Sequence, residues 1–372
     1  MKPFDLKKFG KTISKANTNI QVGFSDPKIW VSTGNYGLNF AVSGDFNKGF
    51  PLEGKMTLLA GESGSSKSYL ACGSCVKWCQ EHGVQTVILD TERALDGDWV
   101  RKIGVDPDAD NLIHINVGLI DDITSVVMSF LNQYKEAYKD VPFEEKQPIM
   151  FVIDSLGMAT TNVEVKHAEE GNNKGDMGLK QKQLYSLCRT FLASIGDNPI
   201  GLLCTQHTYD AQDLYATEKQ IVSGGKGIIY TPSIIAVMKV KKLKDGDSET
   251  SSGDAAKAKN ITGVRVEAML RKTRYNKPYQ QVNFEIPYDT GMNPYSGLFD
   301  LFTSTLEYKN EPILKKSGPQ YVYNDLTTGE EVFKKYRKNI THEDYDRIMA
   351  DYMKVKDVYV APEEDDDEEI EE

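Results

Sequence analysis

Short apolar runs and longer amphipathic segments alternate along most of the chain. From Gly34 onward, runs of strand length that are rich in β-branched residues cover 56–60, 86–89, 149–153, 200–204 and 234–240. Between them lie segments with apolar residues at helical spacing, among them 184–195 and 123–134, the latter expected to start at Asp121 or Asp122. This alternation predicts an α/β fold whose doubly wound, mostly parallel sheet is covered by helices on both faces.

The pattern weakens outside this region. Residues 1–32 form a basic, weakly amphipathic segment with Leu6, Phe9 and Ile13 at helical spacing. Residues 241–260 are polar and separate two strand patterns, which predicts an exposed, mobile hairpin insertion. We expect four parts: an N-terminal arm at 1–32, a core at 33–300, a small C-terminal region at 301–362 and a disordered acidic tail at 363–372.

Composition and charge fit a globular core. Of the 372 residues 40% are hydrophobic, and the five cysteines lie in apolar patterns. The first ten residues are charged, and no apolar run approaches the roughly 18 residues that span a bilayer, so we expect no secretory signal and a soluble, cytoplasmic protein. The net charge is −11, but nine acidic side chains lie in residues 363–372, so the remainder carries only −2 and has room for basic patches.

A loop rich in glycine and serine follows the first apolar run and precedes a helical pattern that ends near Gly83. Its order is that of a phosphate-binding P-loop, in which backbone N–H groups surround phosphates, the lysine reaches the outer ones and the next hydroxyl ligates Mg²⁺. The positions that we assign to nucleotide binding are Gly61, Glu62, Ser63, Gly64, Ser65, Ser66, Lys67, Ser68 and Tyr69. Ser66 stands where a glycine normally precedes the lysine, and a turn without function is the alternative.

Two further strands end in acidic residues. The run at 148–153 ends in Asp154-Ser155, and the run at 84–89 ends in Asp90-Thr91-Glu92. In a doubly wound sheet the carboxyl ends of the strands form the ligand-binding edge. Asp154 is therefore suited to the surroundings of a Mg²⁺ ion, and Glu92 to orienting or deprotonating a water molecule that attacks a γ-phosphate.

The helix after the P-loop also offers a zinc site as an alternative. Its candidate ligands are Cys72, Cys75, Cys79 and His82. Their spacings put all four on one helical stripe, so a single helix would have to supply every ligand of a tetrahedral ion. We interpret this stripe as a core face of small residues.

Several segments resemble RecA-type recombinases, in the same order, over residues 32 to about 300. The segment 87–96 resembles the strand that carries the catalytic glutamate of that family, 32–41 resembles the entry to its core and 102–106 continues the glutamate segment. Segments 175–179 and 223–226 resemble the ends of its two DNA-binding loops, and 271–279 and 291–297 its closing strands. The sequence His207-Thr208-Tyr209, residues 293–298 and the altered P-loop resemble the UvsX branch of tailed bacteriophages.

This resemblance implies a site for ATP and Mg²⁺. Lys67 and Ser68 would hold phosphate and the metal ion, Asp154 would lie beside the metal and Glu92 would activate water. The positions that flank the adenine in the family match Asp96, Trp99 and Tyr288.

The γ-phosphate sensor of the family has two candidates at the end of the 200–204 strand. Counting from Met177 favours Gln206, whereas the phage-like His-Thr-Tyr sequence favours His207. The sensor moves the second of two DNA-binding loops, which we expect as irregular segments at 161–176 and 207–224. The positions that would contact DNA by resemblance are Met177, Lys182, Arg189, Gly224 and Gly225.

Two cations and the N-terminal arm would join neighbouring subunits. Lys272 and Arg274 match cations that the family places across the subunit interface, where they touch ATP bound by the neighbour. Cellular RecA proteins have two lysines there. The arm at 1–32 would dock on the adjacent core and so support a helical filament.

As a whole, the resemblance implies a DNA-dependent ATPase that forms filaments on single-stranded DNA, pairs it with homologous double-stranded DNA and exchanges strands in recombination, repair and recombination-dependent replication. Expected partners are a single-strand DNA-binding protein and a mediator or loader, in the host cell cytoplasm if the protein is phage-encoded. A ring helicase would need an N-terminal domain that 32 residues cannot supply. An ATP-gated accessory paralogue is the second alternative, but such proteins often lose catalytic residues, whereas Lys67, Glu92 and Asp154 are all present.

Overall fold

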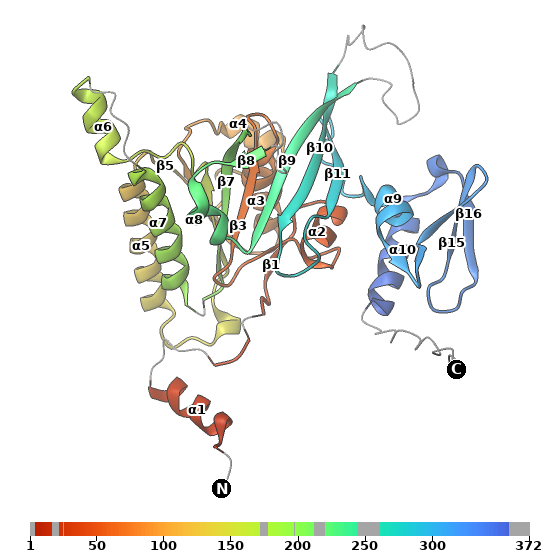
Figure 1. Cartoon of the computed structure of the whole chain (residues 1–372), viewed down its shortest axis with the longest axis horizontal. Helices are drawn as coiled ribbons and strands as arrows, with labels where there is room; N and C mark the ends of the chain where they lie inside the picture. The colour runs from red at the N-terminus through yellow and green to blue at the C-terminus, as the bar shows by residue number, and fades with distance from the viewer. Residues whose placement is uncertain are drawn as a thin grey trace, which may run out of the picture. The chain divides into compact units, whose positions relative to one another are not determined.

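The computed structural model describes residues 4–16, 22–24, 26–171, 178–196, 198–211, 220–244 and 261–356. The chain divides between Ser296 and Gly297 into two compact units (Figure 1). The second unit thus includes residues 297–300, which the sequence pattern assigned to the core.

The first unit is built on a nine-stranded sheet with the order β11-β10-β9-β3-β7-β6-β4-β5 and with β8 beside β7. Its parallel strands are β3 (Met56–Gly61), β4 (Gln85–Asp90), β5 (Leu112–Asn116), β6 (Ile149–Asp154), β7 (Ile200–Asp210) and β9 (Ile234–Lys244). The antiparallel strands are β8 (Gln220–Val222), β10 (Ile261–Lys272) and β11 (Gln281–Pro287). The predicted α/β fold with a mostly parallel sheet is confirmed.

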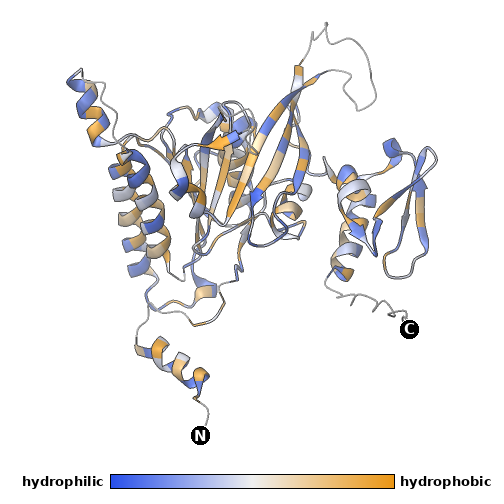
Figure 2. Ribbon diagram, in the orientation of Figure 1, coloured by the Kyte–Doolittle hydropathy of each residue, from blue (hydrophilic) through white to orange (hydrophobic). Residues whose placement is uncertain are grey.

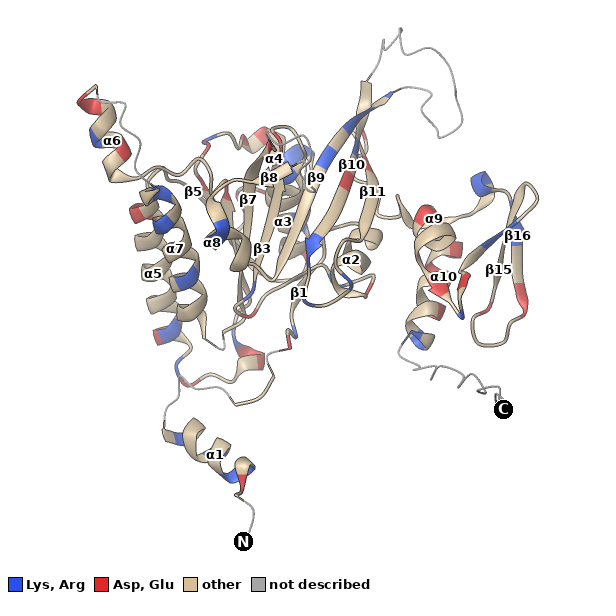
Figure 3. Ribbon diagram, in the orientation of Figure 1, with Lys and Arg blue, Asp and Glu red and all other residues tan. Residues whose placement is uncertain are grey.

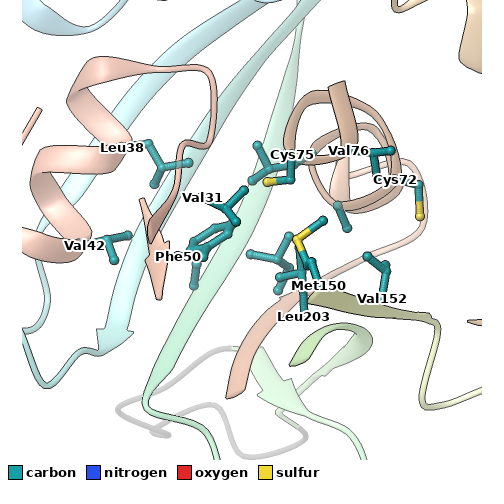
Figure 4. Close-up of a cluster of buried hydrophobic side chains, with 14 of the residues drawn as sticks. Val31, Leu38, Val42, Phe50, Cys72, Cys75, Val76, Met150, Val152 and Leu203 are labelled. Carbon is teal, nitrogen blue, oxygen red and sulfur yellow. The ribbon is translucent and has the colours of Figure 1, made fainter. Parts of the chain in front are cut away.

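Helices and short strands cover both faces of this sheet. One face carries α2 (Tyr36–Ser43), the π-helical η1 (Tyr69–Ser74), α3 (Cys75–Glu81), α4 (Gly97–Lys102) and the pair β1 (Trp30–Val31) and β2 (Phe50–Pro51). The other face carries α5 (Ile120–Ala137), α7 (Leu179–Ile195) and α8 (Gly225–Tyr230). Each face has its own cluster of buried apolar side chains, and Figure 4 shows the first. The central strands are therefore apolar on both sides, as Figure 2 shows.

The cysteine stripe lies in the first of these clusters. Cys72, Cys75 and Cys79 are fully buried against the sheet, and the third of these thiols has its pKa raised to about 12 by burial. His82 lies at the exposed end of the helix, where its ring stacks on Trp78 at 4.0 Å. The interpretation of Cys72, Cys75 and Cys79 as a core face is confirmed.

Two elements differ from their predicted form. The helix expected to start at Asp121 or Asp122 has Leu119 at its N-cap. The two aspartates lie in its first turn, where their negative charges interact favourably with the positive end of the helix dipole. The segment expected as an irregular loop from 161 contains α6 (Asn162–Glu169), because Thr161 and Glu164 form a capping box. The short η2 (Phe143–Glu145) precedes β6.

The strands around the second expected DNA loop are longer than predicted. β7 continues to Asp210 because β8 pairs with its polar end, so the expected irregular segment at 207–224 begins and ends as a hairpin. β9 likewise continues to Lys244, into the expected insertion at 241–260, because β10 pairs with it. Residues 245–260, the tip at 212–219 and residues 172–177 lie outside the described residues.

The second unit has its own small core. Its strands are β12 (Glu307–Tyr308), β13 (Glu311–Pro312), β14 (Leu314–Ser317), β15 (Gln320–Asn324) and β16 (Glu331–Lys335). Its helices are α9 (Leu298–Asp300), the π-helical η3 (Leu301–Thr305), the 3-10 helix η4 (Arg337–Asn339) and α10 (His342–Val355). Tyr323 is fully buried at the centre and donates its hydroxyl to Asp351 of α10 at 3.0 Å. The acidic tail, 363–372, lies outside the described residues.

The N-terminal segment contains α1 (Leu6–Ala16). Its apolar side chains Phe4, Leu6 and Phe9 are exposed. Within the described part of the chain, no helix is both long and apolar enough to cross a membrane.

Candidate functional site

The P-loop connects the carboxyl end of β3 to the helix η1. The Lys67 ammonium folds back over the loop and donates to the carbonyls of Gly61 at 3.0 Å and Glu62 at 2.7 Å and to Ser65 Oγ at 3.3 Å. Burial lowers the pKa of Lys67, while the carboxylates of Asp154, Glu92 and Glu62 act in the opposite direction. The loop therefore holds a cation at its centre, as a phosphate-binding loop requires.

Ser66 adopts a backbone conformation that favours glycine. Its φ is 66°, in the left-handed region, where a side chain normally costs about 1 kcal/mol. This explains why a glycine normally occupies the position before the lysine. The replacement by Ser66 therefore strains the loop at this residue.

Ser68 and Asp154 lie together beside the P-loop. The Ser68 side chain lies close to the Asp154 carboxylate, which accepts a hydrogen bond from Thr205 of β7. Burial raises the pKa of Asp154, although the hydroxyls of Thr205 and Ser68 act against the rise. Hydroxyl and carboxylate oxygens are the ligands that Mg²⁺ prefers, so this pair fits such an ion completed by phosphate and water. Among the described residues, no three His, Cys, Asp or Glu side chains gather into a metal site.

A tight turn after β4 presents Glu92. Buried Asp90 shapes this turn, because its carboxylate accepts from the backbone N–H groups of Glu92 at 3.0 Å, Arg93 at 2.7 Å and Leu95 at 3.2 Å. His114 of β5 contacts the same carboxylate at 3.2 Å. The backbone of Glu92 is thus positioned by the last residue of β4.

The carboxylate of Glu92 has two partners of its own. Its Oε1 accepts from Ser155 Oγ at 2.8 Å and lies 3.2 Å from His207 Nε2. The ends of β4, β6 and β7 therefore meet around one carboxylate, near Lys67 and Asp154. A carboxylate held in this way can accept a proton from a water molecule or orient it.

The two sensor candidates point to opposite faces of β7. Thr205 and His207 share the face that bears Asp154 and Glu92, because side chains alternate along a strand. Gln206 is fully buried on the other face, where its Nε2 donates to the Ser223 carbonyl at 3.2 Å and its Oε1 accepts from the His207 N–H. His207 thus contacts the acidic site, and Gln206 contacts the segment after β8.

A cavity of about 1000 Å³ extends from the P-loop along the helix that follows it. Gly64 and Ser66 line one part, and the rings of Trp99 and Tyr288 line another. Asp96 caps α4, and its carboxylate accepts from the N–H groups of Asp98 and Trp99 at 3.0 Å, so it positions Trp99. Tyr69 lines the same cavity and accepts from the N–H of Met292 at 3.0 Å.

The expected DNA-contacting residues lie on α7 and at the start of α8. Lys182 and Arg189 are exposed on α7, with Arg189 over the ring of Tyr185. Gly224 is the N-cap of α8 and Gly225 its first residue, with φ of 97° and 79°, which glycine adopts readily. The two helices pack together, and Figure 3 shows basic positions on both. Met177 lies outside the described residues.

The pair Lys272 and Arg274 lies at the other end of the sheet. Lys272 pairs with Ile235 of β9, which pairs with Leu58, three residues before the P-loop starts at Gly61. Because β10 runs antiparallel to β9, the chain after Lys272 continues away from the P-loop. Arg274 accordingly lies near Lys55, the residue before β3, and helps to lower the pKa of Lys55. Lys272 donates to the carbonyl of Tyr230 at 2.9 Å, and its own pKa is lowered by burial and by Arg274.

Three contacts around this site had no signal in the sequence. Thr205 and Ser155 each follow an apolar run like many other hydroxyl residues, and only the sheet register brings them to Asp154 and Glu92. Gln220 of β8 donates to Glu62 of the P-loop at 3.0 Å across 158 positions of sequence. Asp90 had a partial signal, because it ends an apolar strand and is followed by Glu92.

No protein-family model matches this chain, but several known proteins are similar to it. The recombination and repair protein of Enterobacteria phage T4 is 24% identical over 265 residues, which are 71% of this chain and 61% of that protein. Protein RecA of Chlorobium chlorochromatii is 25% identical over 331 residues, 88% of this chain and 81% of that protein. Protein RecA of Clostridioides difficile is 25% identical over 330 residues, which are 87% of this chain and 83% of that protein. The chain thus spans less than two thirds of the phage protein.

Proposed function

We propose that the chain is a recombinase of the RecA type, similar to the UvsX branch, and that it is a DNA-dependent ATPase that forms filaments on single-stranded DNA and exchanges strands with a homologous duplex. The observation that carries the proposal is the hairpin of β7 and β8. At one end it contributes His207 to the site of Lys67 and Glu92, and at the other it leads into Gly224. Nucleotide chemistry and the expected DNA loop therefore share one element.

ATP and Mg²⁺ would bind at the P-loop. The backbone of residues 61–68 would surround the phosphates, Lys67 would contact the outer ones, and Ser68 and Asp154 would provide the oxygen surroundings of Mg²⁺. When bound, the metal ion neutralises negative charge on the transferred phosphoryl group. Trp99 and Tyr288, with flat apolar rings on the same cavity, would contact the adenine.

Glu92 would act as the general base of ATP hydrolysis. Its backbone is held by Asp90 and its carboxylate by Ser155, so it can accept a proton from water without reorganising. His207 would sense the γ-phosphate, since its ring touches Glu92, and Gln206 would transmit the change to Ser223 on the way to the second DNA loop. This assigns one role to each of the two sensor candidates.

Lys182, Arg189, Gly224 and Gly225 would contact the DNA backbone, and Met177 would approach the strand. Cations and exposed backbone N–H groups bind phosphates whatever the base sequence, as a protein that must search for homology requires. Lys272 and Arg274 lie too far along the sheet to reach the P-loop of their own chain, which supports their action on ATP bound by a neighbour.

Filament formation would use the arm at 1–32, in which Phe4 before α1 and Leu6 and Phe9 on α1 are exposed. A helix with exposed apolar side chains is suited to burial against another subunit. A single-strand DNA-binding protein and a mediator or loader are the further partners that we propose, in the cytoplasm, which is that of the host cell if the protein is phage-encoded.

The test is an ATPase assay of the full chain with and without single-stranded DNA. We expect strong stimulation by DNA, loss of hydrolysis in Lys67→Ala, and a rate about 10²-fold lower in Glu92→Gln with nucleotide binding retained. Equal rates with and without DNA would contradict the proposal, and a parental rate in Glu92→Gln would contradict the assignment of the base.

A further inference from the structure

A hydrogen bond joins the P-loop to the strand that returns from the second expected DNA loop. Gln220, the first residue of β8, donates its Nε2 to Glu62 Oε1 at 3.0 Å. Glu62 directly follows β3, and β8 lies against the end of that strand. The ATP chemistry proposed above does not use this contact.

The main chain of Glu62 is tied to Lys67. An ammonium group has three N–H donors, and all three have acceptors here: the carbonyls of Gly61 and Glu62, and Ser65 Oγ. The shortest of these contacts, at 2.7 Å, is the one to Glu62. A phosphate oxygen that binds Lys67 must therefore displace one of these acceptors.

Phosphate binding at Lys67 would also act on the charge of the Glu62 side chain. Its carboxylate is close enough to help raise the pKa of Lys67, against the lowering caused by burial. A phosphate beside Lys67 would draw that positive charge toward itself and repel the Glu62 carboxylate, since like charges at short range disfavour each other. Both effects act to move Glu62 away from its present contacts.

We propose that Glu62 and Gln220 form a coupling bond that holds β8 in the arrangement of the nucleotide-free protein, and that phosphate binding at Lys67 releases it. β8 ends at Val222, so release frees the segment that leads to Gly224 and Gly225. This inference rests on the proposed function, because it assumes that ATP strengthens the binding of DNA. Glu62 and Gln220 are positioning residues in this account, and the bond opposes DNA binding only while nucleotide is absent.

The test is the affinity of the full chain for a fluorescent oligothymidylate, measured without nucleotide and with a non-hydrolysable ATP analogue. The ratio of the two dissociation constants gives the coupling. Glu62→Ala and Gln220→Ala should each tighten nucleotide-free binding by about three- to tenfold, the range expected for the loss of one typical hydrogen bond. In Gln220→Ala, which leaves the P-loop intact, the affinity with the analogue should stay the same, so the ratio should fall by that factor.

A double-mutant cycle separates this bond from general damage. The double alanine variant should behave like either single variant, because the second substitution has no bond left to remove. Gln220→Glu, which places two carboxylates together, should release β8 most strongly. Combined with Glu62→Gln, it restores a hydrogen bond with donor and acceptor exchanged, and the ratio should recover.

The control is Glu136→Ala, at an exposed position of α5. It should keep the parental ratio. If the single variants also keep that ratio, or if the exchanged pair does not recover it, the coupling bond is refuted while the proposed function stands. If the parental protein itself binds DNA equally with and without the analogue, the proposed function fails, and the inference fails with it.

Discussion

Ser66 stands where P-loops normally carry glycine, and the backbone there has a φ of 66°. The sequence reveals the replacement, but only the structure reveals the conformation that makes it unfavourable. The same holds for Asp90: its place after an apolar strand predicts an acid at the sheet edge, whereas its bonds to the N–H groups of Glu92 and Arg93 depend on the turn. Residue types were thus predictable at this site, and their contacts were not.

Substitution of Ser66 tests the conformational argument. Ser66→Gly should keep ATP binding and change the free energy of unfolding by less than about 1 kcal/mol, because relief of strain is offset by the greater freedom of the unfolded chain. Ser66→Val should lose about 1–3 kcal/mol and weaken ATP binding, since a β-branched residue is poorly accommodated at positive φ. Urea unfolding and nucleotide titration measure both. Equal behaviour of the two variants would refute a left-handed Ser66.

Asp154 should make stability depend on pH. Burial raises its pKa in the folded state above the unfolded value, so the folded state binds the proton more tightly, and the free energy of unfolding falls as pH rises through that interval. Asp154→Asn removes this fall and should be more stable than the parent at neutral pH by on the order of 1 kcal/mol, while losing Mg²⁺-dependent ATPase activity. Unfolding from pH 4 to 8, without nucleotide or Mg²⁺, is the measurement. If the free energy of unfolding depended on pH in the same way in the parent and in Asp154→Asn, the raised pKa of Asp154 would be contradicted.

At the scale of elements, the apolar strands were predicted well because burial on both faces leaves a continuous signal. The end of β7 was missed because its last residues are polar and are held by pairing with β8, which no local pattern encodes. α6 was missed because a capping box rather than an apolar stripe stabilises it; it has no fully buried residue. Pairing and capping are the two effects that periodicity does not detect.

The alternation of side chains along β7 gives an element-scale prediction. His207→Ala should lower both basal and DNA-stimulated ATPase rates by about ten- to hundredfold, because Glu92 loses a partner that positions it. Gln206→Ala should mainly lower the ratio of stimulated to basal rate, because it breaks the contact to Ser223. The measurement is the ATPase rate of each variant at saturating ATP, with and without single-stranded DNA. An opposite assignment of the two effects would refute the division of roles.

At the scale of the whole molecule, the order of the strands decides which residues can meet. Lys272 pairs with Ile235, which lies beside Leu58 of β3 and not beside the P-loop, and we therefore propose that Lys272 acts on ATP bound to Lys67 of another subunit. That placement could not be read from sequence spacing, because it depends on the antiparallel direction of β10.

Mixing two inactive variants tests action across subunits. Lys272→Ala with Arg274→Ala should bind ATP but lose at least about tenfold in hydrolysis, and Lys67→Ala should also be inactive. A mixture should recover part of the activity at interfaces that pair an intact P-loop with intact cations. Absence of recovery at every ratio, with co-assembly shown by sedimentation, would place the cations outside the hydrolytic site.

The most direct test of the central claim is strand exchange by this protein alone. The reaction contains a circular single strand, a homologous linear duplex, ATP and Mg²⁺, with a heterologous duplex as the control. The account predicts joint molecules only with the homologous duplex, their formation by Glu92→Gln, which binds ATP but hydrolyses it slowly, and none by Lys67→Ala. No joint molecules from the parental protein, under conditions where it hydrolyses ATP in response to single-stranded DNA, would contradict it.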